Sequence, residues 1–182
     1  MAKTKWSLDP MHSELGFKIR HLMITNVSGN FKNFNIEVET ENDDFASAKI
    51  QASIDVDSIN TNNEQRDVHL RNADFFETTT HPKVDFKSTK IVKTGDDAFD
   101  LRGDLTIKGI TKPVHLSLEY SGTAKDPWGN LKAGFALTGK INRKDFGITF
   151  NSPLETGGVA LGDEIKINGE IQLVKQVELQ LA

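Results

Sequence analysis

The stretch Ala48-Lys49-Ile50-Gln51-Ala52-Ser53-Ile54-Asp55-Val56 alternates apolar and polar residues without a break. Successive side chains of a strand point to opposite sides of its sheet, so the apolar members of this stretch share one face and the polar members share the other. This is the pattern of a strand with one buried face and one solvated face. The stretch therefore predicts a sheet that packs one of its sides against other apolar groups.

Seven further segments repeat this alternation, so the chain is predicted to contain eight strands. The other seven are centred on residues 15–21, 34–38, 84–88, 99–107, 113–120, 131–141 and 165–173. Short turns such as residues 95–97 and 126–130 separate several of them, which is typical of antiparallel neighbours. A chain made almost wholly of such strands must join their apolar faces, either as two stacked sheets or as one closed barrel.

Small residues stand in phase with the apolar set, and they favour the barrel. They are Ala48, Ala52, Ser88, Gly103, Ala133, Gly139 and Gly169. In a sandwich these positions would usually carry larger side chains that fill the space between the sheets. In a barrel they either mark bends and bulges or leave volume inside, and the two interpretations are compatible. An eight-stranded barrel can be wide enough to hold one small ligand.

Length and composition limit the classes of protein that the chain can represent. Its 182 residues suit a single domain over residues 1–182, and no internal repeat is visible. The formal net charge of −4 argues against a nucleic-acid partner, because no basic face is available to neutralise phosphates. The first six residues lack the apolar core of a signal peptide. The expected location is therefore the cytoplasm, or the periplasm if a leader has been removed.

One short helix is predicted after the third strand. The segment Thr61-Asn62-Asn63-Glu64 has the form of a capping box, which starts a helix over residues 65–72. Arg66 and His69 share a face of that helix, whereas Asp67 points elsewhere, and we expect these residues to form an interior salt bridge or to anchor the helix. One short helix cannot cover a sheet face. We expect it to plug one end of the barrel, with Phe75 and Phe76 inserted.

Two charged residues continue the inward phase of the seventh strand. Arg143 and Asp145 follow Leu137, Gly139 and Ile141 at intervals of two, so both are expected to point into the barrel near one end. Two interpretations remain open. The pair closes the barrel floor as an ion pair, or Arg143 contacts a polar head group while Asp145 holds it in place. A guanidinium group suits either role because its planar fork can bond two oxygens at once.

The histidines give little support for a metal site or for catalysis. His12, His21 and His69 lack the spacing of a metal-binding motif, so no metal is expected. His21 extends the inward phase of Phe17 and Ile19, and two interpretations remain open: it closes the pore or contacts a head group, or its role is purely structural. The sequence has no nucleophile elbow, no glycine-rich phosphate loop and no cysteine. We therefore predict no catalytic residue and no cofactor.

Five segments, in order along the chain, resemble the YceI-like family. They are residues 6–13 with Phe17 and His21 beyond, residues 29–31, the helical region from Ser58 to Pro82, residues 103–109 with 112–114, and residues 142–147. The resemblance implies an all-β fold, an eight-stranded antiparallel lipocalin-like barrel with a long apolar pore. It also implies binding of polyisoprenoid lipids or isoprenoid quinones, frequent dimers and frequent secretion to the bacterial periplasm.

The sequence and the resemblance together predict a barrel that binds a long-chain isoprenoid in a bore on the order of 25 Å long and carries it, with transient membrane contact. The residues expected to bind the ligand are Phe17, Ile19, His21, Phe75, Phe76, Ala133, Phe135, Leu137, Gly139, Arg143 and Asp145. Two alternatives remain. One is an enzyme that acts on a lipid or small molecule through inward His, Arg and Asp residues, and the other is a stress-related interaction protein.

Overall fold

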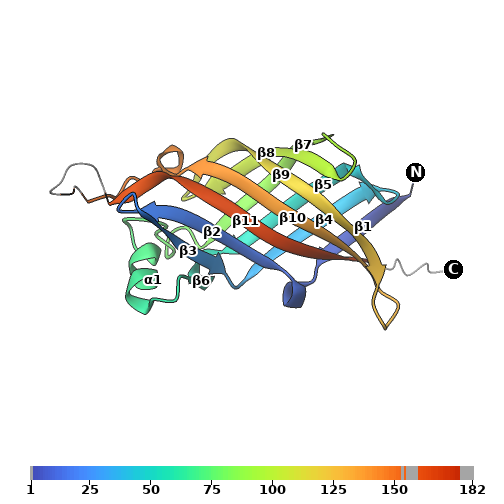
Figure 1. Cartoon of the computed structure of the whole chain (residues 1–182), viewed down its shortest axis with the longest axis horizontal. Helices are drawn as coiled ribbons and strands as arrows, with labels where there is room; N and C mark the ends of the chain where they lie inside the picture. The colour runs from blue at the N-terminus through green and yellow to red at the C-terminus, as the bar shows by residue number, and fades with distance from the viewer. Residues whose placement is uncertain (1, 153, 155–159, 177–182) are drawn as a thin grey trace.

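The computed structural model describes residues 2–152, 154 and 160–176, and eight of the strands within them form a closed antiparallel ring (Figure 1). In spatial order the ring runs β1 (Lys3–Leu8), β4 (Phe34–Glu41), β5 (Asp44–Asp55), β7 (Lys83–Lys93), β8 (Ala98–Ile107), β9 (Ile110–Lys125), β10 (Leu131–Asn142) and β11 (Leu161–Lys175). Strand β1 pairs back with β11 and closes the ring. The predicted barrel is confirmed, and all eight predicted segments are strands.

Three further strands extend the sheet at one end of the barrel. They are β2 (Glu14–His21), β3 (Thr25–Phe31) and β6 (Ile59–Asn60). The first part of β11 pairs with β2 and its last residues pair with β1, so β1 and β2 follow one another along the same side of β11. The strands that sequence reasoning missed are β1, β3 and β6, which are short or carry only two large apolar residues each.

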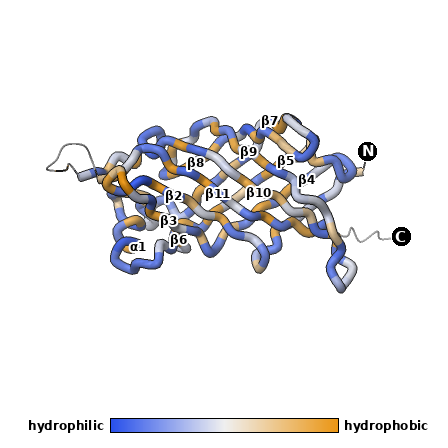
Figure 2. Tube along the Cα trace, viewed as in Figure 1, coloured by the Kyte–Doolittle hydropathy of each residue, from blue (hydrophilic) through white to orange (hydrophobic). Residues whose placement is uncertain are grey.

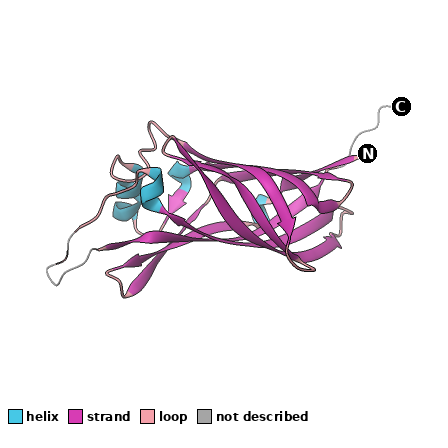
Figure 3. Cartoon of the chain, turned by 90° about the horizontal axis from the view of Figure 1, so that it is seen from above, coloured by secondary structure: helices cyan, strands magenta, loops and turns pink. Residues whose placement is uncertain are grey.

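The α-helix α1 (Glu64–Arg71) lies at the end of the barrel where β2 and β3 meet, as Figure 3 shows. Three 3₁₀ turns complete the elements: η1 (Pro10–His12), η2 (Val56–Ser58) and η3 (Arg143–Phe146). The helix is capped by Asn63, whose side chain accepts a hydrogen bond from the Arg66 amide. The predicted capping box is therefore wrong, because Thr61 lies before the cap and is held by other contacts.

Apolar side chains point into the barrel along the whole ring, which gives the alternating colours along the strands in Figure 2. Two buried clusters result, one containing Phe75 and Phe146 near α1 and the other containing Trp6 and Phe135. Most outward positions are polar, with exceptions such as Val92, Ala136 and Val174. Most of the interior is thus apolar, and its shape depends on how large inward side chains pack against small ones.

The small inward residues have more than one role. A Cβ at Gly103 would lie 2.4 Å from the Phe86 ring, and one at Gly139 would lie 2.5 Å from Leu116 Cδ2, so each glycine allows a neighbour to cross it closely. Ser88 lies at a bulge, and its hydroxyl accepts a hydrogen bond from the Ile50 amide. Gly103, Gly139 and Ser88 therefore bend and pack the wall rather than leave empty volume.

A buried carboxylate ties three elements together away from α1. Asp9 lies at the start of η1 and accepts hydrogen bonds from Lys132 Nζ on β10 at 2.6 Å, His12 Nδ1 at 2.8 Å and Gln172 Nε2 on β11 at 3.1 Å. Burial alone raises the pKa of Asp9. The hydrogen bonds and positive charges of Lys132 and His12 outweigh burial and lower the pKa to about 2.

We expect this carboxylate to make the protein less stable in acid. The ordinary pKa of aspartate is 3.8, so the lowered value contributes about 2 kcal/mol to the free energy of unfolding above pH 4, and this is lost as the pH falls toward 2. Urea denaturation from pH 5 to pH 2 should show the loss. Asp9→Asn should remove that contribution, whereas the exposed Asp97→Asn should not. An equal pH dependence in Asp9→Asn and the unsubstituted protein would contradict the assignment.

Candidate functional site

The barrel encloses a cavity of about 440 Å³, which lies within the usual range for small-molecule sites. Its wall is formed by inward side chains of β2, β3, β4, β5, β7, β8, β9, β10 and β11, together with residues of α1 and η3. Almost all of these side chains are aliphatic or aromatic. The small residues Ala48 and Ala52 of β5 belong to this wall, so at these two positions the sequence does leave room inside.

The few polar side chains of the wall gather at one end. They are His21, Thr61, Arg66, His69 and Arg143. His21 ends β2, Thr61 precedes α1, Arg66 and His69 belong to α1, and Arg143 begins η3. Among the residues that the structure describes, no carboxylate lines the cavity. The cavity is therefore apolar along its length and cationic or neutral-polar at the α1 end.

Arg143 is the most deeply buried charge of this polar end, with 1% of its surface exposed. Its Nε donates a hydrogen bond to the carbonyl of Gly162 at 2.9 Å, and its Nη1 donates to the carbonyls of Ile148 at 3.0 Å and Phe150 at 2.7 Å. Its Nη2 has no hydrogen-bond partner among the described residues and lies 3.8 Å from the half-exposed carboxylate of Asp163. Burial lowers the pKa of Arg143, and the negative charge of Asp163 opposes this.

Asp145 does not join Arg143, so the predicted inward pair is wrong. Strand β10 ends at Asn142, and the chain then turns as a 3₁₀ helix with about three residues per turn. Residues three apart share a face in such a turn. Phe146 is accordingly buried beside Arg143, whereas Asp145 is exposed. The sequence phase that correctly placed Arg143 inside fails two residues later because the strand has ended.

A buried carboxylate anchors α1 at the same end. Asp67 accepts hydrogen bonds from both the amide and the hydroxyl of Thr61, and Arg66 donates through Nε to the Thr61 hydroxyl and through Nη2 to the Thr61 carbonyl. The predicted anchoring of the helix is confirmed at Arg66. Since Arg66 also lines the cavity, one guanidinium group both holds the helix and presents charge to the interior.

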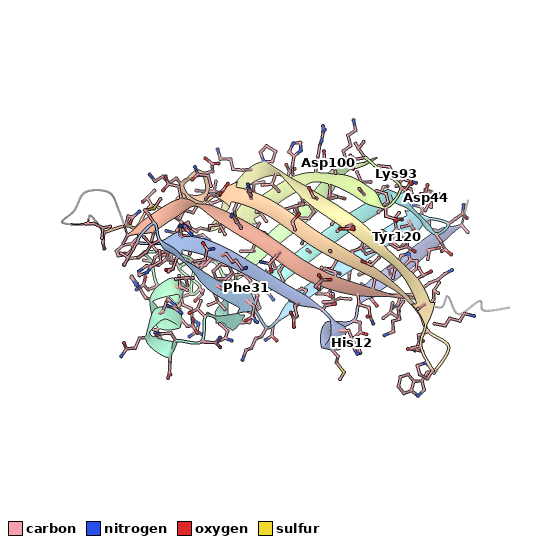
Figure 4. The ribbon with its side chains drawn as sticks, viewed as in Figure 1. His12, Phe31, Asp44, Lys93, Asp100 and Tyr120 are labelled. Carbon is pink, nitrogen blue, oxygen red and sulfur yellow. The ribbon has the colours of Figure 1, made fainter. Side chains whose placement is uncertain are left out.

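Aromatic side chains surround the polar groups at the α1 end. The Phe75 ring packs against His69 with centroids 5.0 Å apart and against Phe150 at 5.3 Å, and Phe76 meets Phe31 edge to face at 6.3 Å. Both Phe75 and Phe76 line the cavity, in keeping with the predicted plug. Figure 4 labels Phe31 on β3, close to α1.

A second aromatic cluster closes the cavity far from α1. Phe45 packs against Phe135 with ring centroids 4.9 Å apart, against Trp6 at 5.0 Å and against Tyr120 at 5.6 Å. Figure 4 places Tyr120 toward the end opposite α1. Phe45 and Phe135 line the cavity, whereas Trp6 is buried behind them. The two ends of the cavity thus differ in chemistry.

Eight of the eleven predicted ligand-binding residues line the cavity: Phe17, Ile19, His21, Phe75, Phe76, Phe135, Leu137 and Arg143. Ala133 is fully buried within the cluster around Trp6 and does not reach the cavity. Gly139 is covered by Leu116, which forms the wall there. Sequence reasoning left Arg66, His69 and Phe150 out of the site. The helical spacing of Arg66 and His69 was a usable signal for the first two.

The three histidines do not meet. His12 pairs with Asp9 at the η1 turn on the side of the barrel (Figure 4), His69 pairs with Asp74 at 2.9 Å, and His21 lines the cavity. Within the described ranges no group of three His, Cys, Asp or Glu residues is placed to hold a metal ion. In the same ranges no helix has the length and apolar character needed to cross a membrane.

Comparison with known proteins identifies close relatives of this barrel. A family model described as "YceI-like domain" matches residues 6–173. A protein of Staphylococcus aureus (strain N315) named UPF0312 is 41% identical over 170 residues, which cover 93% of this chain and 96% of the relative. These names state no reaction.

Solved structures show the same architecture. The Campylobacter jejuni YCEI protein matches with a TM-score of 0.75 and 36% identity, covering 93% of this chain and 97% of that one. BcnA of Burkholderia cenocepacia matches with a TM-score of 0.79 and 22% identity, covering 91% and 98%. A domain of Saccharophagus degradans, described as polyisoprenoid binding, matches with a TM-score of 0.66 and 16% identity over 94% of this chain and 98% of that one.

Proposed function

The chain belongs to the YceI-like family, and from this premise we propose that its barrel binds a long-chain isoprenoid lipid, with the tail in the apolar cavity and the head group at the α1 end. The observation that carries the proposal is the distribution of polar groups in the wall. They lie at one end of an otherwise apolar cavity, which is the distribution that an amphiphile with one head and one long tail requires. The polyisoprenoid-binding description of the Saccharophagus degradans neighbour supports the same ligand class.

The head group is proposed to present oxygen acceptors to Arg143. The three hydrogen bonds of this guanidinium group go to backbone carbonyls that fix its position, while Nη2 has no hydrogen-bond partner among the described residues and lies 3.8 Å from the Asp163 carboxylate. Arg66 adds a second positive charge to the wall. A phosphate or a quinone carbonyl would supply the missing acceptor, and a phosphate would also gain from both charges.

Reversible exchange with a bilayer follows from the same chemistry. Burial of a tail from water is worth about 0.8 kcal/mol per methylene, so the tail would not leave for water at a useful rate. Transfer of the tail between a bilayer and an apolar cavity is nearly neutral. The head-group contacts then decide the direction of transfer, so we propose a carrier rather than an enzyme.

Native mass spectrometry of the purified protein tests this proposal. The protein is offered a polyprenyl phosphate, an isoprenoid quinone and a polyprenol in detergent micelles, with a straight-chain fatty acid as the comparison. We expect one isoprenoid per chain and a preference for the phosphate or quinone over the alcohol. Failure to retain any of the three isoprenoids would contradict the proposal, and so would equal retention of the fatty acid.

A further inference from the structure

The turn between β2 and β3 exposes three consecutive large apolar side chains. The exposed fractions are 39% for Leu22, 55% for Met23 and 72% for Ile24. Single exposed apolar residues are ordinary on protein surfaces, but a contiguous group at the tip of a hairpin is not. All three side chains are thus exposed among the residues that the structure describes.

The backbone of this turn makes the choice of residues more unusual. Leu22 and Met23 both have left-handed conformations, with φ of 53° and 61°, and the Ile24 amide donates a hydrogen bond to the His21 carbonyl at 3.2 Å. Two successive left-handed residues are the requirement of a type I′ turn, for which Asn-Gly is the preferred pair. Leucine and methionine therefore suit neither the solvent nor the backbone here, which is typical of a site kept for function.

The turn projects from the polar end of the cavity. The two strands that it joins contribute Phe17, Ile19 and His21 on one side and Val27 and Phe31 on the other to the cavity wall. Figures 1 and 3 show the turn at the same end of the barrel as α1, whose Val68 side chain is 56% exposed. An object that contacts this turn therefore lies beside the end of the cavity where a head group would enter.

The outward face of the strands leading to the turn carries a row of lysines. Lys18 of β2 lies opposite Lys166 of β11, which in turn lies opposite Lys140 of β10, and all three are exposed. Like charges directly opposite one another destabilise a sheet, so the row of lysines opposes folding rather than favouring it. The outward carboxylates of β2 and β11 are Glu164, which lies 3.9 Å from Lys140, and Glu14 and Glu170, which lie opposite one another farther from the turn. Asp163 lies 3.3 Å from Lys144. The part of the face next to the turn is cationic, because the exposed side chains of Lys18, Arg20, Lys140 and Lys166 outnumber Glu164 and Asp163 there, although the net charge of the chain is −4.

We propose that this surface, the apolar turn of residues 22–24 with the lysine row Lys18, Lys140 and Lys166, docks the barrel on an anionic lipid bilayer. Apolar side chains enter the interfacial region of a bilayer, and basic residues close to them gain from the negative surface potential. This inference rests on the proposed function, because a ligand that resides in a membrane explains why the docking surface adjoins the cavity end. Docking would give the tail a short path between bilayer and barrel.

The test is the triple variant Leu22→Asn/Met23→Gly/Ile24→Ser, which replaces the apolar tip with the residues that the turn prefers. Its thermal stability should equal or exceed that of the unsubstituted protein. Its binding to vesicles of phosphatidylcholine and phosphatidylglycerol, measured by flotation, should fall at least tenfold. Trp128→Ser is the matched control, since Trp128 is 83% exposed in the turn between β9 and β10, which lies at the end of the barrel opposite α1 in Figure 1, and it should bind vesicles normally.

The variant Lys18→Gln/Lys166→Gln separates the charge from the apolar tip. It should bind anionic vesicles several-fold more weakly and pure phosphatidylcholine vesicles no differently from the unsubstituted protein. Flotation of the triple variant with anionic vesicles at unchanged affinity would overturn the docking surface.

Uptake of an isoprenoid quinone from detergent micelles measures ligand binding without membrane docking, and uptake from vesicles requires both. The triple variant should take up the quinone from micelles normally and from vesicles at least tenfold more slowly. Equal rates from vesicles for the triple variant and the unsubstituted protein would overturn docking while leaving ligand binding intact. Absence of uptake from micelles by the unsubstituted protein, with vesicle binding still dependent on the turn, would overturn the proposed ligand and support the docking surface.

Discussion

Replacement of Ala52 by phenylalanine is expected to weaken binding of a long isoprenoid several hundred-fold. Ala52 is one of the two small residues of β5 that line the cavity, and its neighbours across the sheet are Ile36 and Phe86. A benzyl group there would occupy space needed by about four or five carbons of the tail. At about 0.8 kcal/mol for each methylene returned to water, the loss is about 3–4 kcal/mol, which corresponds to several hundred-fold in the dissociation constant.

The adjacent residue of the same strand provides the control for this experiment. Gln51 is exposed on the outer face of β5, so Gln51→Phe adds the same ring without entering the cavity. Both variants should keep the circular-dichroism spectrum of a β-sheet, and only Ala52→Phe should lose affinity for the quinone in a competition measured by native mass spectrometry. Normal affinity in a folded Ala52→Phe protein would place the ligand outside the barrel.

The eight main segments were predictable because each carries its own signal. In β5, Ala48, Ile50, Ala52 and Ile54 repeat at intervals of two, and this alternation needs no knowledge of the rest of the chain. Strand β3 has no such signal, since only Val27 and Phe31 are large and apolar within seven residues. It is a strand because β2 and β6 supply its hydrogen-bond partners. Tertiary pairing overrides local pattern at such positions.

The site was less predictable than the fold because it depends on where regular structure ends. The inward phase of β10 correctly carried Arg143 into the barrel, but the change to a 3₁₀ turn sent Asp145 to the surface. Likewise, the phase of Gly139 is inward, yet Leu116 from the neighbouring strand covers it. Sequence phase gives the direction of a side chain. Packing between neighbouring strands decides which of the inward side chains line the cavity.

The end of the barrel at α1 could be predicted only in outline. The positions of Phe75 and Phe76 after the helix indicated a plug, and both do line the cavity. The helix is fixed by two hydrogen bonds that Thr61 donates to the carboxylate of Asp67. The sequence instead predicted a capping box between Thr61 and Glu64. The carboxylates of Glu64 and Asp67, three residues apart, were both candidates for this contact with Thr61. Only the start of the helix at Glu64 decides between them.

Replacement of Arg143 by alanine is expected to destabilise the protein by about 4 kcal/mol. The variant removes a buried guanidinium group and leaves the carbonyls of Gly162, Ile148 and Phe150 without their donors. Each hydrogen bond from a charged donor contributes about 1.5 kcal/mol or more. Urea denaturation at pH 7 measures the change. Because Asp145 is exposed, Asp145→Asn alone should change stability by less than about 0.5 kcal/mol.

The double variant Arg143→Ala/Asp145→Asn distinguishes the observed geometry from an inward ion pair. An inward pair would leave a buried carboxylate after loss of the arginine, and removal of that charge would restore stability. In the observed geometry there is no such carboxylate, so the double variant should be as unstable as Arg143→Ala. Recovery of most of the lost stability in the double variant would show that the two residues do pair.

Arg143→Lys separates the structural role of this residue from contact with a ligand. Lysine keeps the positive charge, but its ammonium group cannot bond three fixed carbonyls and also present a free nitrogen to a head group. The variant should be folded at 10 °C, bind the bare isoprenoid hydrocarbon squalene as the unsubstituted protein does, and lose its preference for a polyprenyl phosphate or quinone over a polyprenol. If that preference survives while stability falls, Nη2 of Arg143 does not contact the ligand, and the hydrogen bonds of the guanidinium group serve only to join η3 to the segment that follows it and to β11.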